Sequence, residues 1–370
     1  MSNSELYYLL KLSNTPNIGY VIGRRLLATF GSAEAVFQAN KNEVIAIHKV
    51  GNMVYQSLHK TLDIAIENLI QKEIKFIQDN NIQTISIFDS NYPEHLINCP
   101  DAPFLLFLKG TIDLKDKRVI SIIGTRSLTK YGSDFCELLF ESISKYNPVI
   151  VSGLAYGTDI LVHKLALKHN LQTIAVLPTG INLIYPKEHE LYCDDICKNG
   201  GLLTEFTSNK FPEKENFVKR NRIVAGMSVA TIIIESALKG GSLITTTFAN
   251  DYDREVFALP GRVTDVYSKG CNMLIKKFQA NILNSPEDLI QGLNWDVALK
   301  PAKINQTKLF LDLLPNEQLI YDFLIKNGKS FFDSIADGCK LNRSELNTCL
   351  LNMELNGIIK NSPGRFFDIK

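Results

Sequence analysis

Short runs of apolar residues alternate with helix-like stretches between residues 118 and 295. The expected strands are Val119–Ile123, Val149–Val151, Thr173–Leu177, Leu202–Thr204, Ala230–Ile234 and Glu255–Leu259. The helical stretches between them include Gly132–Lys145, Thr158–His169, Asn216–Ala225 and Ser242–Tyr252. Continuous, β-branched apolar runs are typical of parallel strands that are buried on both faces. The pattern therefore predicts an α/β fold with a Rossmann-like, doubly wound parallel sheet.

Residues 1–70 have the spacing of short helices. Two turns that end in glycine, Pro16–Gly19 and His48–Gly51, precede the helix-like stretches Tyr20–Phe30 and Asn52–Lys60. This repeated unit is similar to the helix-hairpin-helix (SAM-like) module, whose turn can offer N–H groups to a DNA phosphate. A helical protein-contact domain fits the pattern equally well. Two further apolar runs, Thr84–Phe88 and Phe104–Leu108, are expected to form extra strands.

Residues 311–370 predict a C-terminal winged-helix domain. The expected elements are helices near Asn316–Lys326, Phe331–Ala336 and Arg343–Asn356, then a hairpin of Ile358–Lys360 and Phe366–Ile369 joined by Pro363-Gly364. Asn342 is the expected N-cap of the third helix and Gly357 the residue that ends it. That helix has a single arginine set against Glu345 and Glu354, which favours protein contact or a weak accessory role over major-groove reading.

The chain is accordingly divided into four parts: a helical domain at 1–70, an extended Rossmann-like domain at 71–295, a linker at 296–310 and the tail at 311–370. Its 370 residues are 45% hydrophobic with a net charge of +1, so any anion-binding site must be a local patch. We see no membrane-spanning run and no signal peptide. The seven cysteines are scattered, without a Cys-x-x-Cys, and a reducing cytoplasm is the expected location.

Several classes of enzyme are disfavoured because their motifs are missing. No G-x-G-x-x-G follows the first strand, and the second strand ends in Ser152 where a nicotinamide-binding domain has an acidic residue. Gly328-Lys329-Ser330 has Phe323 in place of the first glycine of a P-loop. Cys193 and Cys197 have no histidine pair to complete a zinc site. We therefore expect no cofactor and no metal.

Polar turns follow four of the expected strands, at the edge where ligands of doubly wound sheets bind. They are Gly124–Ser127, Ser152–Gly157, Pro178–Gly180 with its continuation to Lys187, and Lys239–Ser242. Each opens toward a helix, so its N–H groups can face an anion. Arg126 and Lys187 add full charges, and Arg220 and Arg222 lie just before the fifth strand. The set predicts an anion-binding site.

Two groups of titratable residues leave room for acid–base chemistry. Asp159 and His163 are four residues apart on one expected helix, but the spacing favours a structural hydrogen bond over a catalytic couple. Glu205 and Glu235 lie near strand ends. They could act as catalytic carboxylates, or equally cap turns or hold the arginines.

Between about residues 118 and 280 the sequence resembles the DprA/Smf family of bacterial DNA-processing proteins. The matching segments, in order, are Ser121–Arg126, Val151–Asp159, Leu177–Asn182, Tyr185–His189, Gly200–Glu205, Arg220–Ser228, Gly240–Thr245, Arg254–Gly261 and Ser268–Ile275. The resemblance implies a non-catalytic protein that binds single-stranded DNA, dimerises, and loads RecA recombinase onto DNA coated by single-strand-binding protein during natural transformation.

The resemblance and the strand-end turns together give the predicted DNA- or phosphate-binding residues: Gly124, Arg126, Ser152, Gly153, Tyr156, Gly180, Asn182, Lys187, Arg220, Arg222, Lys239, Gly241 and Ser242. Many relatives have lysine at the position of Tyr156, so a charge is lost there or a base-stacking ring gained. The predicted homodimer surface contains Met273, Leu274, Ile275 and Phe278. The alternative function is a nucleotide phosphoribohydrolase of the lysine-decarboxylase-like group, because Glu235 and the following Gly-Gly-Ser loosely match its glycine turn.

Overall fold

The expected strands form one large sheet. In this computed structural model the described residues are 2–60, 64–208, 210–296, 313–356, 358–362 and 366–369. Among them, the sheet has nine strands in the order β1-β2-β6-β5-β4-β3-β7-β8-β9. Their bounds are β1 Gln83–Ser86, β2 Leu105–Gly110, β3 Val119–Ile123, β4 Val149–Ser152, β5 Thr173–Val176, β6 Gly200–Thr204, β7 Ala230–Ile233, β8 Glu255–Ala258 and β9 Asn281–Ile282.

Seven neighbouring strands, β6, β5, β4, β3, β7, β8 and β9, run parallel to one another. At the edge beside β6, β2 pairs antiparallel with β6, and β1 pairs antiparallel with β2. Every residue of β3 and of β4 is buried, as their continuous apolar runs predicted. The predicted α/β, Rossmann-like fold is confirmed.

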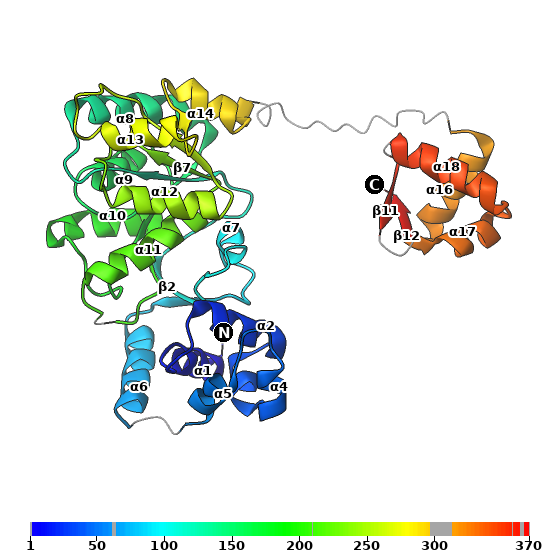
Figure 1. Ribbon diagram of the computed structural model, residues 1–370, viewed down its shortest axis with the longest axis horizontal. Helices are drawn as coiled ribbons and strands as arrows, with labels where there is room; N and C mark the ends of the chain where they lie inside the picture. The colour runs from blue at the N-terminus through cyan, green and yellow to red at the C-terminus, as the bar shows by residue number, and fades with distance from the viewer. Residues whose placement is uncertain are drawn as a thin grey trace. The chain divides into compact units, whose positions relative to one another are not determined.

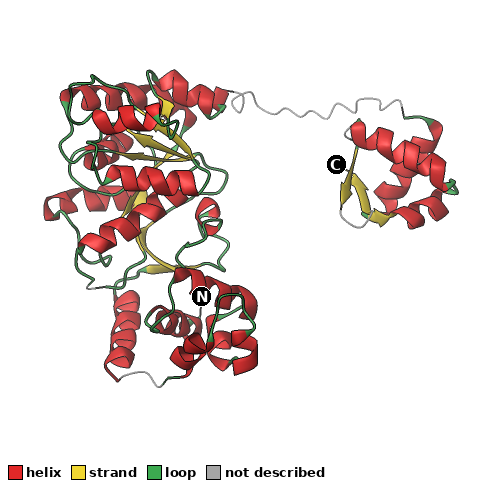
Figure 2. Ribbon diagram, viewed as in Figure 1, coloured by secondary structure: helices red, strands yellow, loops and turns green. Residues whose placement is uncertain are grey.

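Helices cover both faces of this sheet (Figure 2). On one face Ile120 and Ile122 of β3 pack with α8 (Lys130–Ile143), α9 (Thr158–Lys168) and α14 (Pro286–Gly292). On the other, Val119 and Ile123 pack with α11 (Lys214–Gly226), α13 (Lys269–Lys276) and the short α7 (Glu94–Ile97). The helix α12 (Ser242–Asp251) lies against α11, and α10 (Cys193–Lys198) lies against β6. Alternate residues of one strand therefore serve two cores.

The N-terminal region is helical, as predicted (Figure 1). Its helices are α1 Asn3–Ser13, α2 Tyr20–Phe30, α3 Ala33–Gln38, α4 Lys41–Ile45, α5 Asn52–His59 and α6 Ile64–Asp79. The two glycine turns share one backbone geometry, with Asn17 and Lys49 at φ of 64° and 62° two residues before the N-cap glycines of α2 and α5. The sequence repeat is therefore a structural repeat.

The arginines of the first turn serve the fold. Arg24 donates to the carbonyls of Ile97 and Cys99, and Arg25 donates from Nη1 to the carbonyl of His48 at 2.9 Å. The first contact attaches α2 to the segment before β2, and the second links the two glycine turns.

The helical region and the sheet share a hydrophobic core. Leu9, Leu26 and Ile70 belong to the same buried cluster as Phe107 and Leu202 of the sheet. The carboxylate of Glu73 in α6 also accepts from the main-chain N–H of Ser208 at 2.8 Å, beyond β6. Residues Met1–Leu299 form one compact unit, and the division between 1–70 and 71–295 stays a prediction.

The second compact unit is Lys300–Lys370. It contains α16 (Pro315–Asn327), α17 (Phe332–Cys339) and α18 (Arg343–Leu355) with strands β10 (Ser330–Phe331), β11 (Ile359–Ser362) and β12 (Phe366–Ile369). Asn342 caps α18 by accepting from the N–H groups of Ser344 and Glu345. The three helices and the terminal pair of strands match the expected elements, and the winged-helix assignment stays an interpretation. Most of the predicted linker, Gly357 and Pro363-Gly364 lie outside the described residues.

Candidate nucleic-acid interface

A pocket of about 680 Å³ lies at the carboxyl ends of the parallel strands. The chain adds β4, β5 and β6 on one side of β3 and then crosses to place β7 and β8 on the other. Ligands of doubly wound sheets bind at this reversal, where the two neighbouring loops lead away in opposite directions. The pocket is lined by the turns after β3, β4 and β7, by α11 and by the N-terminus of α12.

Six of the predicted binding residues line this pocket: Gly124, Arg126, Gly153, Arg220, Gly241 and Ser242. They come from four segments of the chain that the fold brings to one place. Main-chain N–H groups at the start of α12 add partial positive charge, because the first N–H groups of a helix have no acceptor within it.

Arg126 provides an exposed charge at the pocket. It follows β3 directly, and its guanidinium lies 5.3 Å from the ring centroid of Phe217. Tyr185 packs edge-on against the same ring, with centroids 5.6 Å apart. The arginine is thus held over an aromatic surface while its hydrogen-bond donors stay available to solvent.

Arg220 provides a second, buried charge. Its Nη1 donates to the carbonyl of Val176 at 2.7 Å, and its Nε donates to the side chain of Asn221 at 3.1 Å. Burial lowers the pKa of Arg220 to about 10, and the nearby carboxylate of Asp159 opposes that shift. The guanidinium therefore remains charged at neutral pH, and its position at the pocket is fixed.

Asp159 is the acidic partner at this site. It is buried at the start of α9, where it accepts from the N–H of Ala155 at 3.3 Å. Burial raises the pKa of its carboxyl, whereas the positive charge of Arg220 lowers it. Asp159 balances one buried arginine, which leaves Arg126 and Lys214 as further cations at the rim.

Glycine is required at two positions of the turn after β4. A Cβ on Gly153 would lie 1.9 Å from Nη1 of Arg220, so any side chain there would displace the guanidinium. Gly157 has a φ of 73°, and a Cβ there would lie 2.4 Å from the carbonyl oxygen of Thr125. The turn after β4 is therefore shaped to admit Arg220 and to pack against the turn after β3.

One face of α11 forms a wall of the pocket that sequence reasoning missed. Lys214, Phe217, Asn221 and Val224 recur at intervals of three and four residues and all line it. The signal was present in the helical spacing, which places Phe217 about 60° from Arg220 and Lys214 about 60° from Phe217 around the helix. Unlike the strand-end turns, this face carries no glycine or serine motif that marks it as a binding surface.

The structure places six other predicted residues outside the pocket lining: Ser152, Tyr156, Gly180, Asn182, Lys187 and Lys239. Ser152 is buried and donates to the carbonyl of Ile122 at 2.7 Å. The hydroxyl of Tyr156 donates to Glu188 at 2.8 Å, although the ring stays 42% exposed. Gly180 is buried, and its N–H donates to the carbonyl of Lys210. These roles as DNA contacts stay predictions.

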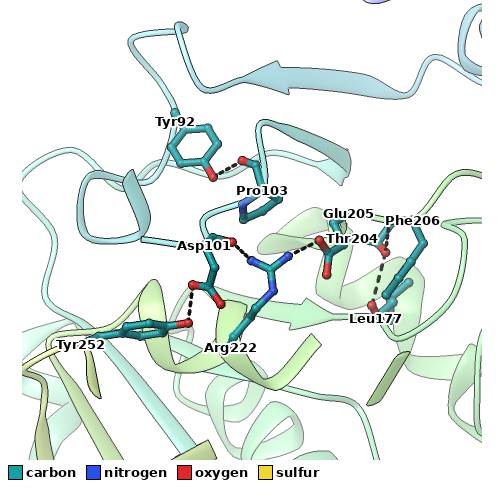
Figure 3. Close-up of polar contacts among 9 residues, drawn as sticks. All are labelled: Tyr92, Asp101, Pro103, Leu177, Thr204, Glu205, Phe206, Arg222 and Tyr252. Atoms are coloured by element: carbon teal, nitrogen blue, oxygen red, sulfur yellow. Dashed lines mark hydrogen bonds and ion pairs between the residues drawn. The ribbon is translucent and has the colours of Figure 1, made fainter. Parts of the chain in front are cut away.

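Arg222 requires a correction, because its charge is used inside the protein (Figure 3). It is 4% exposed, and its guanidinium donates to the carboxylate of Glu205 and to the carbonyl of Asp101. Asp101 in turn accepts from the hydroxyl of Tyr252 at 2.6 Å. The guanidinium also lies 4.1 Å from the ring centroid of Tyr20 in α2. Arg222 thus joins the helical region to the sheet, and does not line the pocket.

The candidate acid–base residues have structural partners. Nδ1 of His163 lies 2.7 Å from the hydroxyl of Thr173, and burial lowers the pKa of this histidine to about 3. The carboxylate of Glu235 accepts from the N–H and the hydroxyl of Thr129 at the start of α8. These contacts match the capping role, one of the three interpretations of this glutamate's position.

The predicted dimer residues differ in exposure. Leu274 is 4% exposed and belongs to the core beneath α13, so it cannot form a contact surface without unfolding. Met273 and Ile275 are half-buried. Phe278 is 96% exposed and lies just before the edge strand β9. Leu274 is therefore removed from the candidate interface, and Phe278 is its main exposed residue.

Two features are absent from the described part of the chain. No helix there is long and apolar enough to cross a membrane. No group of three or more His, Cys, Asp or Glu side chains in the same residues is arranged to hold a metal ion.

The fold and the pocket define a doubly wound α/β protein with a basic cavity at its switch point. Residues 83–294 match the sequence profile of the family described as DNA recombination-mediator protein A. Protein Smf from Synechocystis is 33% identical over 297 residues, which cover 79% of this chain and 74% of that protein. The chain therefore belongs to this family, as its sequence motifs predicted.

Solved structures agree with this assignment. DNA processing protein A from Streptococcus pneumoniae superposes with a TM-score of 0.64 at 32% identity, covering 77% of this chain and 97% of that one. The protein of the same name from Helicobacter pylori, described for its single-stranded DNA binding mode, gives a TM-score of 0.53 at 32% identity. That match covers 58% of this chain and 96% of the other.

Proposed function

We propose that this chain is a non-catalytic recombination mediator that binds single-stranded DNA in the pocket beyond β3, β4 and β7. The observation that supports this most directly is the combination of three cations and three aromatic rings around a single cavity: Arg126, Lys214 and Arg220 with Tyr185, Phe217 and Tyr267. Cations hold a phosphate backbone, and an aromatic ring stacks on an unpaired base whatever its sequence. The Helicobacter pylori relative, described as binding single-stranded DNA, supports the same ligand for this chain.

The pocket favours single strands over duplexes. Phe217 is half-buried between Arg126 and Tyr185, so a base reaches its ring only after leaving a helical stack. Arg126, Lys214 and Arg220 line one cavity, which a rigid duplex enters less readily than a single strand. A flexible strand can instead bend its phosphates toward Arg126 and Lys214.

The family membership extends this proposal to recombinase loading. We infer that the bound strand is passed to RecA on DNA that carries single-strand-binding protein, in the processing of DNA taken up from outside. In an assay of RecA filament assembly on such coated strands, adding this protein is expected to shorten the delay before assembly at least several-fold. An unchanged delay, with single-strand binding intact, would separate DNA binding from loading and contradict this part of the proposal.

The chain is proposed to have no nucleotide-cleaving activity. Glu235, which the phosphoribohydrolase alternative requires as a free carboxylate, accepts two hydrogen bonds from Thr129. Incubation with AMP is expected to release no adenine above a protein-free control. Released adenine that disappears in Glu235→Gln would support the alternative function. Because this substitution weakens the cap of α8, its melting temperature must be measured in parallel.

We propose a homodimer whose interface includes Phe278. A phenylalanine that is 96% exposed beside an edge strand is a natural contact for a second copy. Linking two pockets would raise the affinity for strands that span both by about 10²–10⁴. Phe278→Glu is expected to give a folded monomer by light scattering that binds long and short oligonucleotides almost equally. Val263→Glu, also at an exposed apolar residue, is the matched control and should stay dimeric. A native protein that is monomeric at micromolar concentration would contradict the dimer.

A further inference from the structure

An aromatic ring beside the strand-end pocket is exposed and yet held in place. Ala155 lines the pocket, and Tyr156, the next residue of the turn after β4, is exposed. The hydroxyl of Tyr156 donates to Oε2 of Glu188 at 2.8 Å, and its ring packs edge-on against the buried His189, with centroids 5.0 Å apart. The ring therefore has a fixed position, and part of its surface faces solvent.

The turn that carries Tyr156 has a strained backbone. Leu154 has a φ of 61°, in the left-handed region that residues other than glycine rarely adopt. Its side chain is buried, and Nδ1 of His189 lies 2.7 Å from its carbonyl oxygen. Such conformations persist where surrounding contacts hold them, and they are concentrated at ligand-binding sites. The same histidine thus fixes both the turn and the ring of Tyr156.

Tyr156 extends a row of aromatic rings that begins inside the pocket. Tyr185 lines the pocket, is exposed, and packs against Phe217 with centroids 5.6 Å apart. The hydrogen bond to Glu188 raises the pKa of Tyr156, and the nearby Tyr185 adds to this shift, so the two tyrosines are neighbours. A strand with one base stacked on Phe217 can therefore place a following base on Tyr156.

Glu188 supplies a hydrogen-bond acceptor at the rim of this ring. Its side chain is exposed, and the oxygen that accepts from Tyr156 has a second lone pair. The edge of a base stacked on Tyr156 falls at the same rim, so the polar groups of that base meet the carboxylate. A phosphate would be repelled there, which makes this position suitable for a base and not for the backbone of the strand.

A carboxylate at this position discriminates among the four bases. Guanine has two adjacent donors on its Watson–Crick edge, N1–H and the N2 amine, which match the two oxygens of a carboxylate. Thymine has a single donor between two carbonyl oxygens, which the carboxylate repels. Adenine and cytosine each have one amine beside an acceptor nitrogen. Guanine is therefore the favoured base, and thymine the least favoured.

We propose that Tyr156 and Glu188 form a base-reading subsite beside the pocket, where one unpaired guanine stacks on the ring and donates two hydrogen bonds to the carboxylate. This inference rests on the proposed binding of single-stranded DNA and adds to it a preference at one position of the strand. The exposed Lys187 precedes Glu188 and supplies a cation for the neighbouring phosphate.

Fluorescence anisotropy with the full chain tests the subsite. A short strand of thymine alone is compared with the same strand carrying one central guanine, which cannot form a folded guanine structure. The native chain is expected to bind the guanine strand about fivefold or more tightly. Glu188→Gln keeps an acceptor for the Tyr156 hydroxyl and should lose this gain without weaker binding of the thymine strand. Tyr156→Ala should lose the gain and also bind both strands more weakly.

Glu190→Gln is the matched control, because it makes the same change of charge at an exposed glutamate two residues further along. It should keep the preference for guanine, and an equal loss in this variant would assign the preference to general charge and overturn the subsite. A gain that survives in Glu188→Gln or Tyr156→Ala, with native melting temperatures, would also reject it.

The same titrations separate the subsite from the proposed function. Equal affinity of the native chain for both strands, with binding still abolished in Arg126→Glu, would overturn the subsite and leave single-strand binding in the pocket standing. Absence of binding to either strand would overturn both.

Discussion

Replacing Arg126 with glutamate is expected to remove most single-strand binding while leaving the fold intact. Arg126 is exposed at the rim of the pocket, and its described contact is with the ring of Phe217, so few folding interactions are lost. A charge-assisted hydrogen bond to phosphate contributes about 1.5–3 kcal/mol, and reversal of the charge adds repulsion. The affinity for a single-stranded oligonucleotide is therefore expected to fall by about 100-fold or more, as measured by fluorescence anisotropy.

Lys115→Glu is the matched control. Lys115 is exposed and precedes β3, so it lies near the amino end of that strand, at the edge opposite to the pocket. The same change of charge there is expected to lower affinity less than threefold. The salt slope of binding should also become shallower in Arg126→Glu, because fewer counterions are released. Equal losses in both variants would mean that general charge rather than this pocket controls binding.

The parallel sheet could be predicted from sequence because each strand is encoded locally. Val119–Ile123 is continuously apolar and β-branched, and the observed strand has the same limits. The two glycine turns could also be recognised from their sequence repeat, and the structure adds that Asn17 and Lys49 have a positive φ at equivalent positions of the two turns. The helix α6 was missed in part: residues 71–79 were not assigned to any element, although Ile70, Ile74 and Ile77 have helical spacing.

The pocket was only partly predictable, because its residues depend on which side of α11 faces the cavity. Arg220 and Arg222 are two residues apart in one matching segment, and nothing in the local sequence separates their roles. Two residues of helix correspond to about 200°, so the side chains leave the helix on nearly opposite sides. Arg220 reaches the carboxyl edge at Val176, whereas Arg222 reaches Glu205 and Asp101 beneath α2.

The same reasoning explains the residues that were missed or misplaced. Lys214 and Phe217 precede the motif that drew attention to α11, and they enter the site only because the helix runs along the cavity. Leu274 was placed on a surface because its segment is apolar, but an amphipathic helix buries one side of such a segment. Leu274 lies on the side of α13 that packs into the core, whereas Phe278 follows the end of this helix and is exposed.

Arg222→Met is expected to cause the largest loss of stability of any substitution discussed. The substitution leaves the side chain of Glu205, which is 0% exposed, as an unpaired buried carboxylate. Breaking one partner of such a pair typically costs about 3–5 kcal/mol. The buried Trp295 is the single tryptophan of the chain and lies in the unit that contains the pair, so its fluorescence during urea unfolding reports the loss.

The double variant Arg222→Met/Glu205→Leu distinguishes the ion pair from packing. Removing both charges should restore most of the stability, because apolar side chains of similar volume need no desolvation of a charge. Burial already raises the pKa of Glu205, and losing Arg222 raises it further. A carboxyl whose folded-state pKa is raised destabilises the protein above its unfolded-state value, so the deficit of Arg222→Met should shrink as the pH falls toward about 4. A deficit that persists unchanged at low pH, or in the double variant, would assign the role of Arg222 to packing alone.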